Sequence, residues 1–170
     1  MRKLLPLLVL LLTACVTAQA EQVSNKAIKT YDFSKLAAWV GKSPSSAVVK
    51  GGKSFWDDSD LQRALAALLG KDEAKLIYTG WNGAFSESDV TKFGNVINVY
   101  ICKENDCNLN ALELYVDIQK NILQGCYRRA NNFIRGEDYW ISNIEKSRKL
   151  PAEACSKSPG ESGYRIYGTK

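Results

Sequence analysis

The apolar residues in the first part of the chain recur at the three- and four-residue spacing that is typical of amphipathic helices. After the acidic run Asp57-Asp58-Ser59-Asp60, whose oxygens suit the free N–H groups at a helix start, leucine and alanine follow this spacing up to Gly70. Glycine is the residue that most often ends a helix in a left-handed conformation. The pattern therefore predicts a helix from Asp60 to Gly70. Two shorter helices are predicted over residues 32–40 and 72–78.

Beyond Gly94 the hydrophobic period changes to two, which is typical of half-buried antiparallel strands. Apolar residues at 97, 99 and 101 form the first run, and those at 112, 114, 116 and 118 form the second. The fold class is thus α+β: an antiparallel β-sheet meander covered by the N-terminal helices, with a disulfide-closed hairpin loop between the first two strands. Further elements are a strand over 122–129, a strand around 139–141 and a short helix over 143–150.

The chain begins with the basic pair Arg2-Lys3, continues with an apolar run to Leu12 and then reaches small residues, which is the pattern of a secretory signal. The run is too short for a membrane-spanning helix. A lipobox over residues 12–15 would end the signal at residue 14 and leave Cys15 as the lipidated first residue, whereas Ala18-Gln19-Ala20 fits ordinary cleavage of a signal peptide over 1–20. We expect a periplasmic protein, either soluble or lipid-anchored to the outer membrane.

The 150 residues that remain after a 20-residue signal are enough for one domain with a hydrophobic core. We expect this domain over residues 21–155 and a loose tail over 156–170. The whole chain has 23 basic and 18 acidic residues, and loss of the signal removes two basic ones, which leaves a net charge of +3. This mild basicity, without a dense cluster of lysine and arginine, argues against nucleic-acid binding.

Four cysteines remain in the predicted domain, an even number that suits disulfides in an oxidising compartment. Of the three pairings that four cysteines allow, the simplest joins Cys102 to Cys107 and Cys126 to Cys155. A metal site is not expected, because the chain has no histidine and no CxxC pair. The first disulfide would close a short, stiff, charged loop at the hairpin tip, and this loop is the main candidate binding site. Its polar residues are Lys103, Glu104, Asn105 and Asp106.

The composition also argues against catalysis. Without histidine, the chain has no Ser-His or Cys-His nucleophile pair. Two carboxylate pairs, Glu104 with Asp106 and Glu137 with Asp138, look exposed, so neither is expected to have the perturbed protonation that acid–base catalysis needs. No phosphate- or dinucleotide-binding glycine pattern occurs. We therefore expect a non-catalytic protein that needs no cofactor and no metal.

The aromatic residues have two interpretations. Four tryptophans, at 39, 56, 81 and 140, fit packing in the core or on the sheet. Alternatively, exposed aromatic side chains on the strands would form a surface for stacking against a glycan such as peptidoglycan. The candidates for this surface are Tyr100, Tyr115 and Trp140.

Several segments lie in a characteristic order between residues 39 and 155. They are Val40-Gly41-Lys42-Ser43-Pro44, Asp60 to Gly70, Cys102-Lys103-Glu104-Asn105-Asp106-Cys107, Val116-Asp117, and Leu150-Pro151 with Cys155. In this order they resemble the Ivy family, the periplasmic inhibitors of vertebrate lysozyme and their relatives.

The resemblance implies an exported domain whose disulfide-closed loop enters the cleft of a c-type lysozyme and blocks its catalytic carboxylates. Some family members form dimers, so a homodimer is a further expectation. The chain departs from the family at the loop apex, where the inhibitors carry Pro-His and this chain has Glu104-Asn105. The first hypothesis is therefore an inhibitor of a lysozyme-type muramidase. The alternative is an envelope interaction or immunity-type protein that uses the same fold without inhibiting lysozyme.

Overall fold

The computed structural model describes residues 31–48, 51–130, 136–157 and 166–167. The predicted signal over residues 1–20, including Cys15, lies outside this part of the chain, as does most of the predicted tail. Within the described residues, no helix is long and apolar enough to cross a membrane.

The strongest helical prediction is confirmed. Helix α2 spans Ser59–Leu69, and the Asp58 side chain accepts hydrogen bonds from two backbone N–H groups of its first turn. Gly70 follows the last turn with a φ of 89°, a positive value that glycine adopts without strain. Helix α3 spans Lys71–Tyr78 and confirms the helix predicted next to it.

The segment predicted as a helix over residues 32–40 adopts a tighter form. Residues Ser34–Trp39 make the 3₁₀ helix η2, in which Leu36 and Trp39 are buried. Their spacing of three is the repeat that places side chains on one side of a 3₁₀ helix. The other described 3₁₀ turns are η3 (Phe55–Asp57), η4 (Gly80–Asn82) and η5 (Ala154–Ser156).

The described strands form one antiparallel sheet in the order β1-β3-β4-β5-β6-β7, with β2 also paired to β3. From β3 to β6 the neighbours are consecutive in the chain, as predicted for a meander, and β7, which was not predicted, continues this order. Strands β1 and β2 were not predicted, because each has only three, mostly exposed residues and therefore shows no hydrophobic alternation. The bounds are β1 Phe85–Glu87, β2 Thr91–Phe93, β3 Val96–Lys103, β4 Ala111–Asp117, β5 Ile122–Ala130, β6 Gly136–Ser142 and β7 Arg148–Lys149.

The short helix predicted over residues 143–150 is wrong. This segment bends and then forms β7 beside β6. The Asn143 side chain accepts from the Leu123 N–H at 2.9 Å and donates to the Asn121 carbonyl at 2.9 Å. These side-chain bonds tie residue 143 to β5 and to the residue just before it, and they compete with helix formation.

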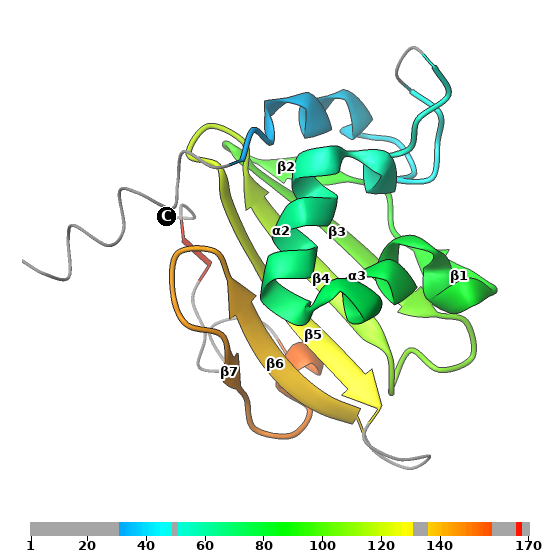
Figure 1. The fold of residues 1–170 in the computed structure, drawn as a ribbon, viewed down its shortest axis with the longest axis vertical. Helices are drawn as coiled ribbons and strands as arrows, with labels where there is room; N and C mark the ends of the chain where they lie inside the picture. The colour runs from blue at the N-terminus through cyan, green and yellow to red at the C-terminus, as the bar shows by residue number, and fades with distance from the viewer. Residues whose placement is uncertain (1–30, 49–50, 131–135, 158–165, 168–170) are drawn as a thin grey trace, which may run out of the picture.

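One face of the sheet packs against helices, and we call it the helix face. Figure 1 shows α2 lying across the strands, with α3 beside it. Leu61 and Leu65 of α2 belong to the same buried cluster as Ile97 of β3, Leu114 of β4 and Leu123 of β5. The predicted combination of an antiparallel sheet with helices is thus confirmed.

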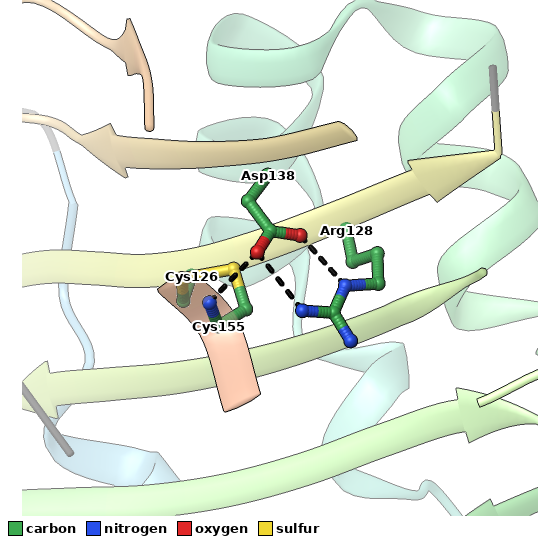
Figure 2. The surroundings of a disulfide bond; sticks show 4 residues. All are labelled: Cys126, Arg128, Asp138 and Cys155. Atoms are coloured by element: carbon green, nitrogen blue, oxygen red, sulfur yellow. Dashed lines mark hydrogen bonds and ion pairs between the residues drawn. A yellow bond between two sulfur atoms is a disulfide. The ribbon is translucent and has the colours of Figure 1, made fainter. Parts of the chain in front are cut away.

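The opposite side of the sheet, called here the second face, carries a smaller hydrophobic cluster around the fully buried Trp140. The segment after β7 runs to this face, where the disulfide between Cys126 of β5 and Cys155 of η5 joins it to the sheet (Figure 2). The other buried members of the cluster are Val96, Tyr115, Cys126, Leu150 and Ala154.

The described part of the predicted tail also contacts the sheet. Ile166 packs against the cluster on the second face. The Tyr167 N–H donates to the Gln124 side chain at 2.6 Å, and the Lys120 ammonium lies 5.3 Å from the centre of the Tyr167 ring. Residues 166–167 therefore lie against the domain.

Candidate functional site

The tip loop, residues 102–107, begins with the last two residues of β3 and lies in the turn that leads to β4. It is closed by a disulfide between Cys102 and Cys107, with an S–S distance of 1.96 Å. The second predicted disulfide, between Cys126 and Cys155, is also present, with an S–S distance of 2.11 Å. Both pairings chosen from the cysteine spacing are therefore confirmed.

The apex of the tip loop is a tight turn. The Asp106 N–H donates to the Lys103 carbonyl at 3.0 Å, and Asn105 has a φ of 61°. Asparagine tolerates this left-handed conformation better than most residues, which explains its place in the turn. Glu104 and Asn105 are both exposed. The loop therefore presents these two side chains to solvent.

The charges of the tip loop are partly satisfied within it. The Lys103 ammonium lies 2.7 Å from a carboxylate oxygen of Asp106, and the two side chains are 43% and 35% exposed. Glu104 and Asn105 have no side-chain hydrogen bond or ion pair to another described residue. Of the four predicted binding residues, these two are thus available at the apex, whereas the other two bind each other.

The base of the tip loop is held by backbone hydrogen bonds on both sides. The Lys103 N–H donates to the Asn110 carbonyl at 3.0 Å, and the Glu104 N–H donates to the Ala84 carbonyl at 3.1 Å. The second bond joins the loop to Ala84, the residue just before β1, and Phe85 of β1 stands opposite Lys103 in the sheet register. The loop is therefore held by β1 as well as by its own disulfide.

A strained segment precedes β1. Gly80, Trp81 and Asn82 have φ values of 60°, 54° and 58°, and a Cβ added at Gly80 would lie 2.1 Å from the Phe85 ring. Glycine is therefore needed at position 80 for both its conformation and its lack of a side chain. Phe85 is 36% exposed, so this arrangement leaves a partly exposed aromatic ring in the strand beside the tip loop.

The second face holds a buried ion pair next to the Cys126–Cys155 disulfide (Figure 2). Two nitrogens of the Arg128 guanidinium, Nε and Nη2, donate to the Asp138 carboxylate at 2.6 and 2.9 Å. The Cys155 N–H donates to the same carboxylate at 2.8 Å. This hydrogen-bonded partner raises the pKa of Arg128.

The expectation that Asp138 is exposed is wrong, because only 1% of this residue is accessible to solvent. The sheet register places Asp138 directly opposite Arg128, and the C-terminal segment then covers the pair. Its neighbour Glu137 is only half-buried and binds the Lys149 ammonium at 2.6 Å. The burial of Asp138 could have been predicted from the alternation of β6, because Asp138 and Trp140 are two residues apart and lie on the same face.

A hollow of about 410 Å³ lies on the second face between the two disulfides. Its floor includes Ala111, which stands in register between Cys102 of β3 and Arg128 of β5. Tyr100 and Glu113 also line the hollow, and Cys107 borders it on the side of the tip loop. The small side chain at position 111 leaves this space between larger neighbours.

The predicted aromatic surface is not formed. Trp140 is fully buried and Tyr115 is 9% exposed, so only Tyr100 of the three candidates is accessible, and it is half-buried. The prediction that tryptophans pack in the core is confirmed for Trp39 and Trp56 as well, which are 3% and 4% exposed.

The described residues contain no group of three or more acidic or cysteine side chains arranged to hold a metal ion. No protein-family model, no curated protein and no solved structure matches the chain.

Proposed function

We propose that this chain is an exported, non-catalytic inhibitor of a peptidoglycan-cleaving muramidase, and that its tip loop enters the cleft of the enzyme. The proposal is supported above all by one observation: an exposed Glu104-Asn105 apex stands on a loop that is closed by a disulfide and hydrogen-bonded on both sides. The resemblance of the sequence to the Ivy family suggests the class of target.

Rigidity of the loop favours tight binding. Fixing the backbone of a flexible residue opposes association by about 1–2 kcal/mol, and a loop that already has its bound shape avoids part of this loss. The tip loop contains only four residues between its cysteines. Its turn is further fixed by the hydrogen bond between Asp106 and Lys103.

The chemistry of the apex suits a glycosidase cleft. Retaining glycosidases hold two carboxyl groups about 5–5.5 Å apart, one ionised and one protonated. The amide of Asn105 can donate to the first and accept from the second. Lys103 can exchange Asp106 for a carboxylate of the target at little loss, because an exposed ion pair of this kind contributes only about 0–1 kcal/mol.

A second candidate function rests on the charge of the loop. Lys103 contributes one positive charge, whereas Glu104 and Asp106 contribute two negative ones, so the loop has a net charge of −1. A negative apex is complementary to a basic pocket and would be repelled by an acidic cleft. This charge favours an envelope interaction or immunity-type protein whose partner is a basic protein other than a lysozyme.

The test is inhibition of cell-wall lysis by the purified protein that starts at Glu21. We expect inhibition of at least one lysozyme-type muramidase, and Asn105→Ala should raise the inhibition constant about tenfold, which corresponds to about 1.4 kcal/mol. Lys103→Ala should have a similar or smaller effect. Lys92→Ala is the matched control, since Lys92 is exposed on β2 and pairs with Ile97, far along β3 from the tip loop.

Unchanged lysis by all lysozyme types at micromolar inhibitor would reject this function. The envelope-partner function would then be tested by capture from envelope extract, with the Glu104→Lys variant as the comparison. Recovery of a basic non-hydrolase by the natural protein, and its loss with Glu104→Lys, would support that function.

A further inference from the structure

We propose that the hollow on the second face is a binding site for a small zwitterion that carries an ammonium and a carboxylate a few ångströms apart, as a free α-amino acid does. The inference does not depend on muramidase inhibition. It rests on the shape of the hollow and on two oppositely charged side chains that line it, Arg128 and Glu113.

The hollow has the size and rigidity of a ligand site. Its volume of about 410 Å³ lies within the range of about 300–1,000 Å³ that is usual for small-molecule pockets. Cys107 on one side and Cys126 and Cys155 on the other belong to the two disulfides, so covalent bonds fix both borders. The methyl group of Ala111, 6% exposed, forms part of the floor. The space is therefore largely formed before any ligand enters.

Arg128 is positioned to receive the carboxylate. The residue is 8% exposed, and Asp138 binds two of its guanidinium nitrogens. Figure 2 shows the remaining nitrogen pointing away from Asp138, and this nitrogen has no hydrogen-bond partner among the described residues. Gly136 leaves space for the arginine stem, since a Cβ added there would lie 2.6 Å from Arg128 Cγ. A buried guanidinium held by a carboxylate behind it is well suited to bind a second carboxylate in front.

Glu113 is positioned to receive the ammonium. One of its carboxylate oxygens accepts from the Asn98 amide at 3.2 Å, and the other has no hydrogen-bond partner among the described residues. Glu113 lies two residues along β4 from Ala111, which pairs with Arg128, so the two charged side chains start about 7 Å apart along the strand direction. Tyr100 stands opposite Glu113 and adds a hydroxyl group to this end of the hollow.

The charge balance selects a zwitterion over the other ligand classes. The charge of Arg128 is offset by Asp138, while Glu113 and the nearby Glu153 add two negative charges, so a simple anion meets a net negative field. A simple cation would leave the third nitrogen of the Arg128 guanidinium, the one that does not bind Asp138, without an acceptor. A neutral sugar would desolvate both charged groups without an opposite charge in return, which is unfavourable. A ligand with both charges satisfies both ends.

The experiment is an NMR titration of the ¹⁵N-labelled mature protein with four probes. L-Alanine carries both charges, N-acetylalanine lacks the ammonium, ethylamine lacks the carboxylate, and N-acetylglucosamine is neutral. We expect saturable shifts at Ala111, Glu113 and Arg128 with alanine, and at least tenfold weaker binding of the other three. No saturable binding of alanine in the millimolar range, or equal binding of any other probe, would overturn the proposal.

Two variants keep the test specific. Glu113→Gln preserves the shape and the acceptor for Asn98, and should weaken alanine binding about tenfold while leaving the affinity for N-acetylalanine unchanged or higher. Ala111→Leu should fill the floor and abolish binding, provided that the spectrum of the variant remains that of a folded protein. Lys92→Ala on β2, an exposed residue outside the hollow, is the control and should bind alanine as the natural protein does. Unchanged alanine binding by Glu113→Gln would contradict the assignment.

Discussion

On the helix face of the sheet, aliphatic side chains of α2 and of β3 to β5 fill the space between the two layers, and stability comes from removing this apolar surface from water. The second face buries fewer apolar residues. It holds instead a disulfide, a buried ion pair and a hollow of about 410 Å³. Non-directional apolar packing dominates the helix face, whereas a disulfide and hydrogen-bonded charges hold the second face together around the hollow. The candidate binding groups accordingly lie on the second face and at the hairpin tip beside it.

The largest effect is expected when the buried ion pair is broken. Arg128→Met should lower the free energy of unfolding by about 3–5 kcal/mol, because it leaves the Asp138 carboxylate buried without its cation. The measurement is urea-induced unfolding followed by circular dichroism. The double variant Arg128→Met/Asp138→Leu should recover part of this loss, although the Cys155 N–H then lacks its acceptor. Lys103→Met, at the exposed pair of the tip loop, is the control and should change stability by about 0–1 kcal/mol.

The two disulfides should differ in their contribution to stability. Replacing Cys126 and Cys155 by serine opens a loop with a sequence separation of 29 and should lower the free energy of unfolding by about 3.5 kcal/mol on the chain-entropy model. The corresponding change at Cys102 and Cys107 opens a separation of 5 and should lower it by about 2 kcal/mol. Unfolding of both double variants in urea measures the difference. Only the second variant should also lose muramidase inhibition, and an inhibitor that is unaffected by opening the tip loop would contradict the proposed mode of binding.

A smaller effect is expected at Gly136. In Gly136→Ala, the added methyl group would lie 2.6 and 2.8 Å from Cγ and Cδ of Arg128. The arginine stem must therefore shift, and overpacking of this kind lowers the free energy of unfolding by about 1–3 kcal/mol. Gly83→Ala is the matched control, since a Cβ at Gly83 meets no atom within 4 Å. Equal stability of the two variants in thermal unfolding would show that Arg128 is not confined by this strand.

The smallest expected effect is on the pH dependence of stability, and it involves one tyrosine on each face of the sheet. Burial raises the pKa of Tyr127, on the helix face, and its hydrogen bond to Glu73 raises it further. Burial also raises the pKa of Tyr100, on the second face. A phenol with a raised pKa in the folded state contributes stability below the unfolded value of 10.0, and this contribution is lost as the pH rises above that value.

Stability should therefore fall above about pH 10, which urea unfolding at a series of alkaline pH values will measure. Tyr127→Phe should make this fall less steep. Tyr100→Phe should have a weaker influence, because Tyr127 is 2% exposed whereas Tyr100 is half-buried. A steeper fall in Tyr127→Phe would contradict the direction of the pKa change.

Much of the fold was predictable because its signals are local. The acidic cap, the helical spacing and Gly70 together define α2 within a dozen residues, and period-two alternation defines β3 and β4. The cysteine spacing indicated both disulfides, because Cys102 and Cys107 lie close together at a predicted hairpin tip and leave Cys126 to pair with Cys155. The same two cysteines also indicated that residues 103–106 form the hairpin tip.

Other features depended on contacts between distant segments. The burial of Asp138 required its register opposite Arg128 and the return of Cys155 from the C-terminal segment. The hollow required a small side chain at position 111 of one strand between larger ones on its two neighbours. The failed helix over 143–150 arose in the same way, because Asn143 binds a neighbouring strand. Residue type and spacing determine whether a short segment is a helix, a strand or a closed loop. The pairing of strands decides which polar groups are removed from water. This pairing brings distant segments together and is therefore seen only in the tertiary structure.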